Sequence, residues 1–472
     1  MRQIRSSPQQ HGTQPDVETA KAPAARQTRQ TTAWAAAGWG EGDDWAAALE
    51  GALAQIAPPR QSGRRRAAPA GGAPAEGAAP RRARPGAGAA VGAPDLLCVF
   101  ATAAFEAHFP PLLARAREAT GARVVVGCSG WGVIGGEREL EATPAVALLA
   151  LALPGATLEP VRLTQAQVER APAAGTPEAA EYWQRLTAVA PGAANAWLLF
   201  ADPFTLGADA VVGGLGAAFP RAPIVGGLAS GNLRGRRTHV FLGGEAFDGG
   251  GAAVALGGAW TVETIVSQGC TPIGEPWTIT GVDGQQIETI ARRPAFEVLA
   301  DTVRALPVDL ARRARGNLFA GLAMDERRAT LKRGDFLIRN IYSVSPTTGT
   351  LLVGATPELG QTIQFQLRDA AAADEDLRAL LDAAREQLRD VSPLAGLLCA
   401  CTGRGAGLFG APDHDAGTVQ ARLGPLPLAG FFCNGEFGPV GGRNFIHGYT
   451  ASLALFVPAG GERRGKRQEA SA

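Results

Sequence analysis

The sequence predicts an α/β (mixed α+β) protein with two related halves, each made of mixed β-sheets covered by helices and built from repeated β-α-β-β units. From Asp95 onward, short apolar runs alternate with helical stretches, the order expected when helices cover a sheet. A glycine-rich strand–loop–strand pattern occurs twice, around Cys128 and again around Cys433. Before Asp95 only one short segment has a helical pattern. We therefore expect a disordered N-terminal region ahead of the folded part.

The first 94 residues contain a single stretch with hydrophobic periodicity. Trp45, Leu49, Leu53 and Ile56 fall on one face of a helix, so this segment is expected to dock on the core. The sequence before it is rich in Gln, Thr and Arg, and the sequence after it is rich in Pro, Gly, Ala and Arg. Neither composition buries enough apolar area to fold, so both flanking stretches are expected to be disordered.

Apolar runs and helical patterns then predict the elements of the two halves. Strands are expected at 96–101, 123–127, 145–153, 196–200, 223–225, 238–242, 252–256, 317–323, 336–344, 349–353 and 362–367. Helices are expected at 106–120, 207–219, 294–306 and 374–390. A Pro and a Gly between residues 345 and 349 favour a tight turn that joins two of these strands.

Composition limits the class of protein. The chain has 472 residues, 46% of them hydrophobic, and a formal net charge of +1. No run approaches the roughly 18 apolar residues of a membrane span, and no secretory leader is evident, so we expect a cytoplasmic protein without membrane insertion. Six cysteines without a compact spacing suit thiols in a reducing compartment. The basic segment lacks aromatic residues for base stacking, so no nucleic-acid partner is expected.

The repeat is carried by two long segments. VVVGCSGWGVIGGERELEATPAVALLAL in the first half matches GFFCNGEFGPVGGRNFIHGYTASLALF in the second, with Cys128 aligned to Cys433 and Gly130 to Gly435. LLC precedes each segment at a similar distance, beginning at Leu96 and at Leu397. The pattern predicts one strand–loop–strand device used twice; chance similarity between two glycine-rich strands is the alternative.

The second copy is much more polar than the first. Its glycines let backbone N–H groups face a ligand, and the segment adds six polar or reactive side chains. These are Cys433, Asn434, Glu436, Arg443, Asn444 and His447. We interpret this segment as the centre of a binding site.

Several blocks of the chain resemble a known family. FLIRN, GQTIQFQLRDA, ACTGRGAGLFGAPDHDA and AGFFCNGEFGPVGGRNFIHGYTASLALF resemble successive blocks of the FIST C domain. GCSGWGVIGGERELE, LLFADPF and PIVGGLASG resemble the FIST N domain. The resemblance implies a sensory, signal-transduction module that binds a small polar ligand, proposed to include amino acids. Because the chain shows no kinase, cyclase or receptor segment, its output is expected to pass through a separate signalling partner protein.

Together these observations divide the chain into six parts. They are a disordered tail at 1–42, a docking helix at 43–57, a disordered basic linker at 58–94, a FIST N domain at 95–258, a FIST C domain at 259–458 and a disordered basic tail at 459–472.

Four arginines at strand ends or beside glycine loops have the geometry to grip a carboxylate. They are Arg339, Arg368, Arg404 and Arg443. For each of them the alternative is a structural ion pair with a nearby aspartate. Glu436 is expected to take a ligand ammonium group, or else to lock its own loop by accepting backbone N–H groups.

The full expected ligand-binding set is Asn434, Glu436, Arg443, Asn444, His447, Arg404, His414, Arg339, Arg368, Cys128 and Ser129. No cofactor and no metal are expected, because the Cys399-Ala-Cys401 alternation on a buried strand suits core thiols better than zinc ligands. Catalysis stays open as an alternative: Cys433, with His447 and Glu436, has the residue types for acyl or thiol chemistry.

Overall fold

The computed structural model describes residues 32–56, 92–232, 235–314, 316–328 and 330–460. The alternation of strands and helices expected from the sequence is confirmed, and the fold is a mixed α+β structure with several mixed sheets. Residues 1–31 of the expected N-terminal tail, and nearly all of the expected basic linker and C-terminal tail, lie outside these residues.

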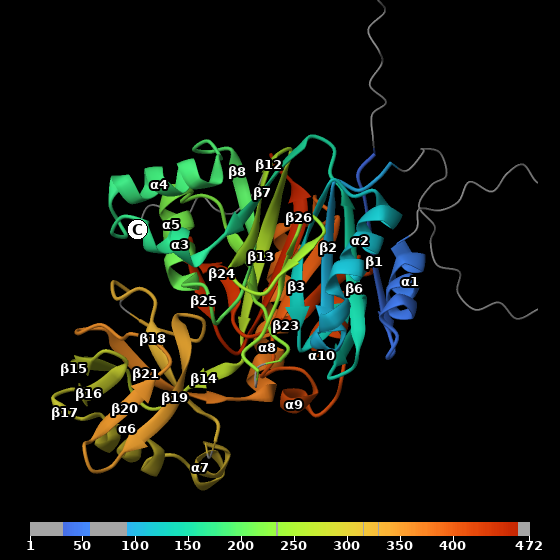
Figure 1. The fold of residues 1–472 in the computed structure, drawn as a ribbon. Helices are drawn as coiled ribbons and strands as arrows, with labels where there is room; N and C mark the ends of the chain where they lie inside the picture. The colour runs from blue at the N-terminus through green and yellow to red at the C-terminus, as the bar shows by residue number, and fades with distance from the viewer. Residues whose placement is uncertain (1–31, 57–91, 233–234, 315, 329, 461–472) are drawn as a thin grey trace, which may run out of the picture.

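Three six-stranded sheets form the body of the molecule (Figure 1). The first sheet has the order β1 (Trp34–Glu41), β6 (Ala145–Ala152), β2 (Leu96–Thr102), β3 (Val124–Gly130), β10 (Val240–Leu242), β11 (Glu245–Phe247). The second has the order β7 (Ala156–Leu163), β12 (Gly251–Gly258), β8 (Ala194–Ala201), β9 (Ile224–Leu228), β24 (Glu436–Val440), β25 (Arg443–His447). The third has the order β13 (Trp260–Gln268), β26 (Thr450–Pro458), β22 (Ala395–Cys401), β23 (Leu428–Cys433), β4 (Gly132–Gly135), β5 (Arg138–Glu141).

The three sheets share one topology. In each of them the two central strands are parallel and every other neighbouring pair is antiparallel. The repeat expected between the two ends of the chain is thus real, and a third equivalent unit, residues 156–258, lies between them. The organisation is threefold, where the sequence had suggested two halves.

Each unit gives one hairpin to another unit's sheet. The β4–β5 hairpin follows β3 in the chain but pairs with β23 of the third sheet. The β24–β25 hairpin follows β23 but pairs with β9, and the β10–β11 hairpin follows β9 but pairs with β3. The exchange forms a closed ring, so each sheet needs strands from two units.

Strand register corrects the expected alignment of the repeats by two residues. One glycine in each unit packs so closely on the neighbouring parallel strand that a Cβ would collide with a backbone carbonyl there; the three are Gly127, Gly226 and Gly430. When these glycines are matched, Cys128 is equivalent to Phe431 of the third unit, and not to Cys433. The error of two residues keeps each side chain on the correct face of its strand, because strands have a period of two.

The inner faces of the three sheets pack on one another in a single apolar core. Phe100, Phe200 and Phe431, one from each sheet, meet there with ring centroids 5.1–5.9 Å apart. Each is fully buried, and such a side chain contributes about 1.5–3 kcal/mol through the hydrophobic effect. The centre of the fold is therefore built equally by all three units.

Helices cover the outer faces of the sheets. Their bounds are α1 (Trp45–Ile56), the 3₁₀ helix η1 (Ala103–His108), α2 (Phe109–Thr120), α3 (Gln165–Glu169), α4 (Pro177–Thr187), α5 (Ala208–Ala218), α8 (Ala370–Gln387), α9 (Ala406–Phe409) and α10 (His414–Leu423). Helices α1 and α2 pack on the first sheet, α4 and α5 on the second, and α8 and α10 on the third. Each outer layer buries its own apolar cluster, separate from the central core.

The expectation of disorder up to residue 42 was wrong for residues 34–41. They form β1, which pairs antiparallel along the whole of β6. The segment is mostly Ala, Gly and Trp, so it shows no alternation of apolar and polar residues. Its small residues are required by packing: a Cβ at Gly38 would collide with the Ala52 carbonyl of α1. The strand is specified by its neighbours and not by a local pattern.

A second, smaller body is inserted between β13 and α8. It contains β14 (Cys270–Pro272), β15 (Trp277–Asp283), β16 (Gln286–Ile290), β17 (Arg293–Pro294), α6 (Ala295–Arg304), α7 (Val308–Ala314), β18 (Leu318–Ala323), β19 (Phe336–Ser345), β20 (Thr350–Val353) and β21 (Thr362–Arg368). Six of its strands close into an antiparallel barrel in the order β15-β16-β20-β19-β18-β21 and back to β15. Figure 1 shows this barrel beside the three sheets, at the lower left.

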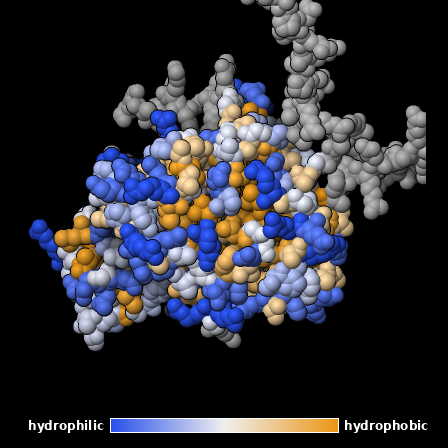
Figure 2. All heavy atoms as spheres, turned by 45° about the horizontal axis from the view of Figure 1, so that its top comes forward, coloured by the Kyte–Doolittle hydropathy of each residue, from blue (hydrophilic) through white to orange (hydrophobic). Residues whose placement is uncertain are grey.

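The surface is unevenly polar. Figure 2 shows hydrophobic residues gathered in the middle of one face, with hydrophilic residues around them. Among the described residues, no helix has the length and apolar character that crossing a bilayer requires.

Candidate functional site

A cavity of about 960 Å³ lies between the barrel and the second sheet. The barrel contributes residues of β18, β19 and the loop 354–361 to its wall. The body of three sheets contributes Arg443 and Phe445 of β25 and Asp209 in the first turn of α5. The wall therefore combines the polar hairpin singled out from the sequence with the inserted barrel.

Two of the expected ligand-binding arginines, Arg339 and Arg443, line this cavity. Arg339 donates from Nη1 to the Ile338 carbonyl at 3.0 Å and from Nη2 to the Ile446 carbonyl at 2.9 Å. Burial lowers the pKa of Arg339, and the charge of Asp209 opposes that effect. No carboxylate of the described residues lies within ion-pair distance of either guanidinium. Both guanidinium charges can therefore interact with a ligand or with solvent.

Arg443 is held more loosely than Arg339. Its Nη1 donates to the Met324 carbonyl at 3.4 Å, and its guanidinium lies 5.3 Å from the centroid of the Phe445 ring. The residue is exposed, so its side chain can reorient toward a bound molecule.

The cavity wall also contains two carboxylates that form neither an ion pair nor a side-chain hydrogen bond with the described residues. These are Asp209 and Glu358. By contrast, the neighbouring Asp325 pairs with Arg327 at 3.0 Å, and Glu326 accepts the Thr362 N–H at 2.9 Å. The wall therefore offers both unpaired cations and unpaired anions, which is the combination that a molecule carrying both charges requires.

Glu436 lies elsewhere, fully buried where β24 meets β26. Its Oε2 accepts the Thr450 N–H at 3.1 Å and the Thr450 hydroxyl at 2.7 Å, and its Oε1 accepts the Cys433 thiol at 3.3 Å. Burial raises its pKa to about 7, against the opposing effect of these hydrogen bonds. In this arrangement the carboxylate ties two strands together and does not face the cavity.

His447 is the strand partner of Glu436 and is also buried. Its Nε2 lies 3.0 Å from the Gly438 carbonyl. Burial lowers its pKa to about 4, so the ring is neutral at pH 7, and Nε2 must carry the proton to donate to that carbonyl. The imidazole stabilises its own hairpin.

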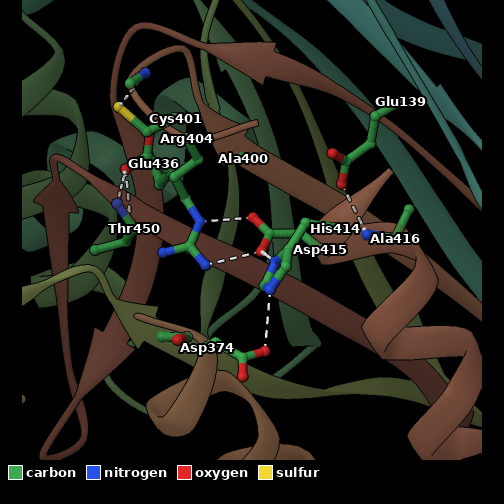
Figure 3. A network of polar contacts seen from close by, with 12 residues as sticks. Glu139, Asp374, Ala400, Cys401, Arg404, His414, Asp415, Ala416, Glu436 and Thr450 are labelled. Atoms are coloured by element: carbon green, nitrogen blue, oxygen red, sulfur yellow. Dashed lines mark hydrogen bonds and ion pairs between the residues drawn. The ribbon is translucent and has the colours of Figure 1, made fainter. Parts of the chain in front are cut away.

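Arg404 forms a buried two-pronged ion pair with Asp415 (Figure 3). Nε lies 2.6 Å from Oδ2 and Nη2 lies 2.8 Å from Oδ1. Burial alone would raise the pKa of Asp415, but the charge and hydrogen bonds of Arg404 hold it at about 2. His414 bridges this pair to Asp374, with 3.0 Å from its ring nitrogens to each carboxylate, and stacks on Phe409. The structural ion pair raised as the alternative for Arg404 is what the structure has.

The remaining expected residues hold segments of the fold together. Arg368 donates to the Gly403 carbonyl at 3.1 Å and to Asn317 at 3.2 Å. Asn444 accepts the Ile224 N–H at 2.8 Å and donates to the Ala222 carbonyl at 3.1 Å.

Three further candidates lie near the strand ends. The Ser129 hydroxyl donates to the Ser230 carbonyl at 2.9 Å. Cys128 is fully buried in the central core, and Asn434 is exposed in the turn before β24. The structure thus divides most of the expected set into three groups. These are arginines that line the cavity, a buried ion-pair network, and side chains that hold segments of the fold together.

Asp209 and Glu358 were not identified from the sequence. Asp209 follows the start of α5, where an acidic residue is common because it interacts favourably with the helix dipole. Glu358 lies in a loop without a distinctive motif. Their importance follows only from the meeting of three distant segments, which are α5, β19 with the loop 354–361 that follows its hairpin, and β25.

Comparison with known proteins finds two domain models along this chain. The FIST N domain model matches residues 95–293 and the FIST C domain model matches residues 295–439, so the boundary between the two falls inside the barrel. The chain is 38% identical over 369 residues to an uncharacterized protein of Mycobacterium tuberculosis (strain H37Rv), covering 78% of this chain and 92% of that protein. It is 41% identical over 260 residues to an uncharacterized protein of Mycobacterium bovis, covering 55% of this chain and 67% of that protein. The chain is therefore a member of the FIST domain family, a family of sensory domains.

Proposed function

We propose that this protein is a sensor that binds a small polar molecule with both charges, such as an amino acid, in the cavity between the barrel and β25. Arg443 and Arg339 bind the ligand carboxylate, and Asp209 and Glu358 bind its ammonium group. The supporting observation is that these four charged side chains line one cavity and have no ion-pair partner there among the described residues. A guanidinium is suited to this role because it grips a carboxylate with two parallel hydrogen bonds.

The position of the cavity suggests how binding is reported. Arg339 and Glu358 belong to the barrel, whereas Asp209 and Arg443 belong to the body of three sheets. A ligand that contacts both sides favours the relative position in which all four groups reach it. A separate signalling protein that distinguishes this position from the unliganded one supplies the output.

Catalysis by Cys433 gains no support from the geometry. The thiol is fully buried, and its sulfur lies 3.2 Å from the Ala400 carbonyl and 3.3 Å from Glu436, so its single proton can be donated to either. Burial raises its pKa well above the usual value, which opposes formation of the nucleophilic thiolate. His447 is hydrogen-bonded to Gly438 instead of to the thiol.

Isothermal titration calorimetry with a panel of amino acids tests the proposal. We expect saturable binding of at least one member and a loss of at least tenfold in affinity, about 1.4 kcal/mol, in Arg443→Ala. Arg312→Ala is the matched control, because Arg312 lies on α7, is largely exposed and does not line the cavity. Equal affinities for the wild-type protein and Arg443→Ala would refute the site.

A further inference from the structure

The size of the cavity is out of proportion to a single amino acid. Its volume of about 960 Å³ is near the upper end of the roughly 300–1,000 Å³ that is typical of pockets for drug-sized ligands. One amino acid would leave most of this space to water. The cavity therefore has room for a longer molecule.

The wall also includes a strand at the edge of its sheet. β25 is the outermost strand of the second sheet, and no strand of the described residues pairs with its outer edge. Across the cavity, β20 pairs with β19 only from Ile341 onward, but the carbonyls of Phe336, Ile338 and Asn340 on that side already accept hydrogen bonds within the chain, so the edge of β25 is the one left to a peptide. Unpaired strand edges bind extended peptides through main-chain hydrogen bonds.

Side chains of β25 and β19 line the same cavity with the spacing of strands. Arg443 and Phe445 of β25, two residues apart, line the cavity, and so do Leu337 and Arg339 of β19. Alternate residues of a strand lie on one face, so each strand presents one cation and one apolar group on the face toward the cavity. The Ile446 carbonyl on the edge of β25 already accepts a donor from outside its sheet, the Arg339 guanidinium.

The rim of the cavity adds apolar surface. Leu359 is 69% exposed, a high value for a leucine, and lies in the cavity wall next to Glu358. A peptide side chain that covered Leu359 would remove this apolar surface from water, whereas a bare ammonium or carboxylate would not.

We propose that the ligand of this cavity is a short peptide with free ends, bound in an extended conformation along the edge of β25. Arg443 and Arg339 hold its terminal carboxylate, and Asp209 and Glu358 hold its terminal ammonium group. Main-chain hydrogen bonds to β25 fix the segment between the ends. This inference rests on the proposed function and narrows its ligand from any small molecule with both charges to a peptide.

The test compares defined ligands on the full-length protein by thermal shift and calorimetry. The probes are a mixture of the free amino acids, an equimolar pool of tripeptides with free ends, and the same pool acetylated and amidated. We expect the free-ended tripeptides to raise the melting temperature most, and capping of both ends to weaken binding at least tenfold. Arg443→Ala should lose the shift, whereas Arg312→Ala should keep it.

A second ligand series tests the strand edge without altering the protein. A binding tripeptide from the pool is resynthesised with a methyl group on its central amide nitrogen, which removes one main-chain donor. We expect at least tenfold weaker binding, and unchanged affinity would refute the edge pairing. If free amino acids bind as tightly as tripeptides, the peptide inference fails and the proposed function stands. If neither amino acids nor tripeptides bind, both fail.

Discussion

The first and third hairpins occupy equivalent places in the fold but differ in polarity at their most buried positions. Val133 of β4 lies opposite Leu140, and Glu436 of β24 lies opposite His447. In the second unit the corresponding pair is Val240 and Phe247. Two units thus fill the position with apolar pairs, and the third fills it with a carboxylate and an imidazole.

This difference separates what the repeat requires from what the third unit adds. The topology forms equally well around an apolar pair, so Glu436 and His447 are not needed for the hairpin as such. Their buried groups depend on partners that the third unit supplies, Thr450, Cys433 and Gly438. The same hairpin also carries Arg443 into the cavity at its outer edge.

The largest expected effect is a loss of stability when the aromatic core that the units share is disrupted. Phe100 and Phe200 sit at equivalent positions of the first and second sheets and meet at the centre of the core. Phe100→Ala and Phe200→Ala should each lower the free energy of unfolding by about 3–5 kcal/mol, because each leaves a cavity in a packed core. Urea denaturation measures both. A loss confined to one of them would contradict equal roles for the units.

A polar residue placed in the first hairpin should be costly. Val133→Glu puts a carboxylate at the position equivalent to Glu436 but without the hydrogen bonds that Thr450 gives there. We expect destabilisation of about 3 kcal/mol or more, since an unpaired charge is buried. Val133→Ile at the same position is the control and should stay near the wild-type stability in the same urea experiment.

The buried carboxylate of Glu436 should make stability depend on pH. Its pKa is raised from 4.5 to about 7 in the folded protein. Its contribution is therefore fully present below pH 4.5 and is lost as pH rises toward and through 7, because the unfolded chain releases the proton more readily. The difference between 4.5 and about 7 corresponds to about 3 kcal/mol.

Glu436→Gln isolates this effect, because the amide stays neutral at every pH. The stability of the variant relative to the wild-type protein should rise between pH 5 and pH 8, as measured by urea denaturation at each pH. Burial also raises the pKa of Glu139, to about 8, but that group is present in both proteins and cancels in the comparison. A constant difference across this range would show that Glu436 is not neutralised by burial.

The sequence predicted much of the fold and less of the site, for a physical reason. Apolar runs and glycine loops are local, so the strands, the helices and the likeness of the two end units followed from them. The pairing of the β4–β5 hairpin with β23 is accompanied by contacts with distant residues, such as the Ala416 N–H that Glu139 accepts and the ion pair of Arg138 with Asp413, and no local pattern in the sequence shows them.

The site shows the same limit. Polarity drew attention to Glu436 and Arg404, but buried polar groups satisfied by partners within the chain look the same in sequence as ligand-binding groups. Arg339 and Arg443 were identified as candidates by residue type, and only the folded barrel brings them together with Asp209 and Glu358. Which of several arginines is unpaired cannot be deduced from spacing.

The most direct test compares two residues of the third hairpin, Arg443 at its exposed edge and Glu436 at its buried base. Calorimetry with one identified ligand should give at least a tenfold loss of affinity in Arg443→Ala, equal to about 1.4 kcal/mol. Glu436→Gln should bind like the wild-type protein, since the carboxylate faces Thr450 and not the cavity. The opposite result, with affinity lost in Glu436→Gln and kept in Arg443→Ala, would contradict the assignment of the ligand to this cavity.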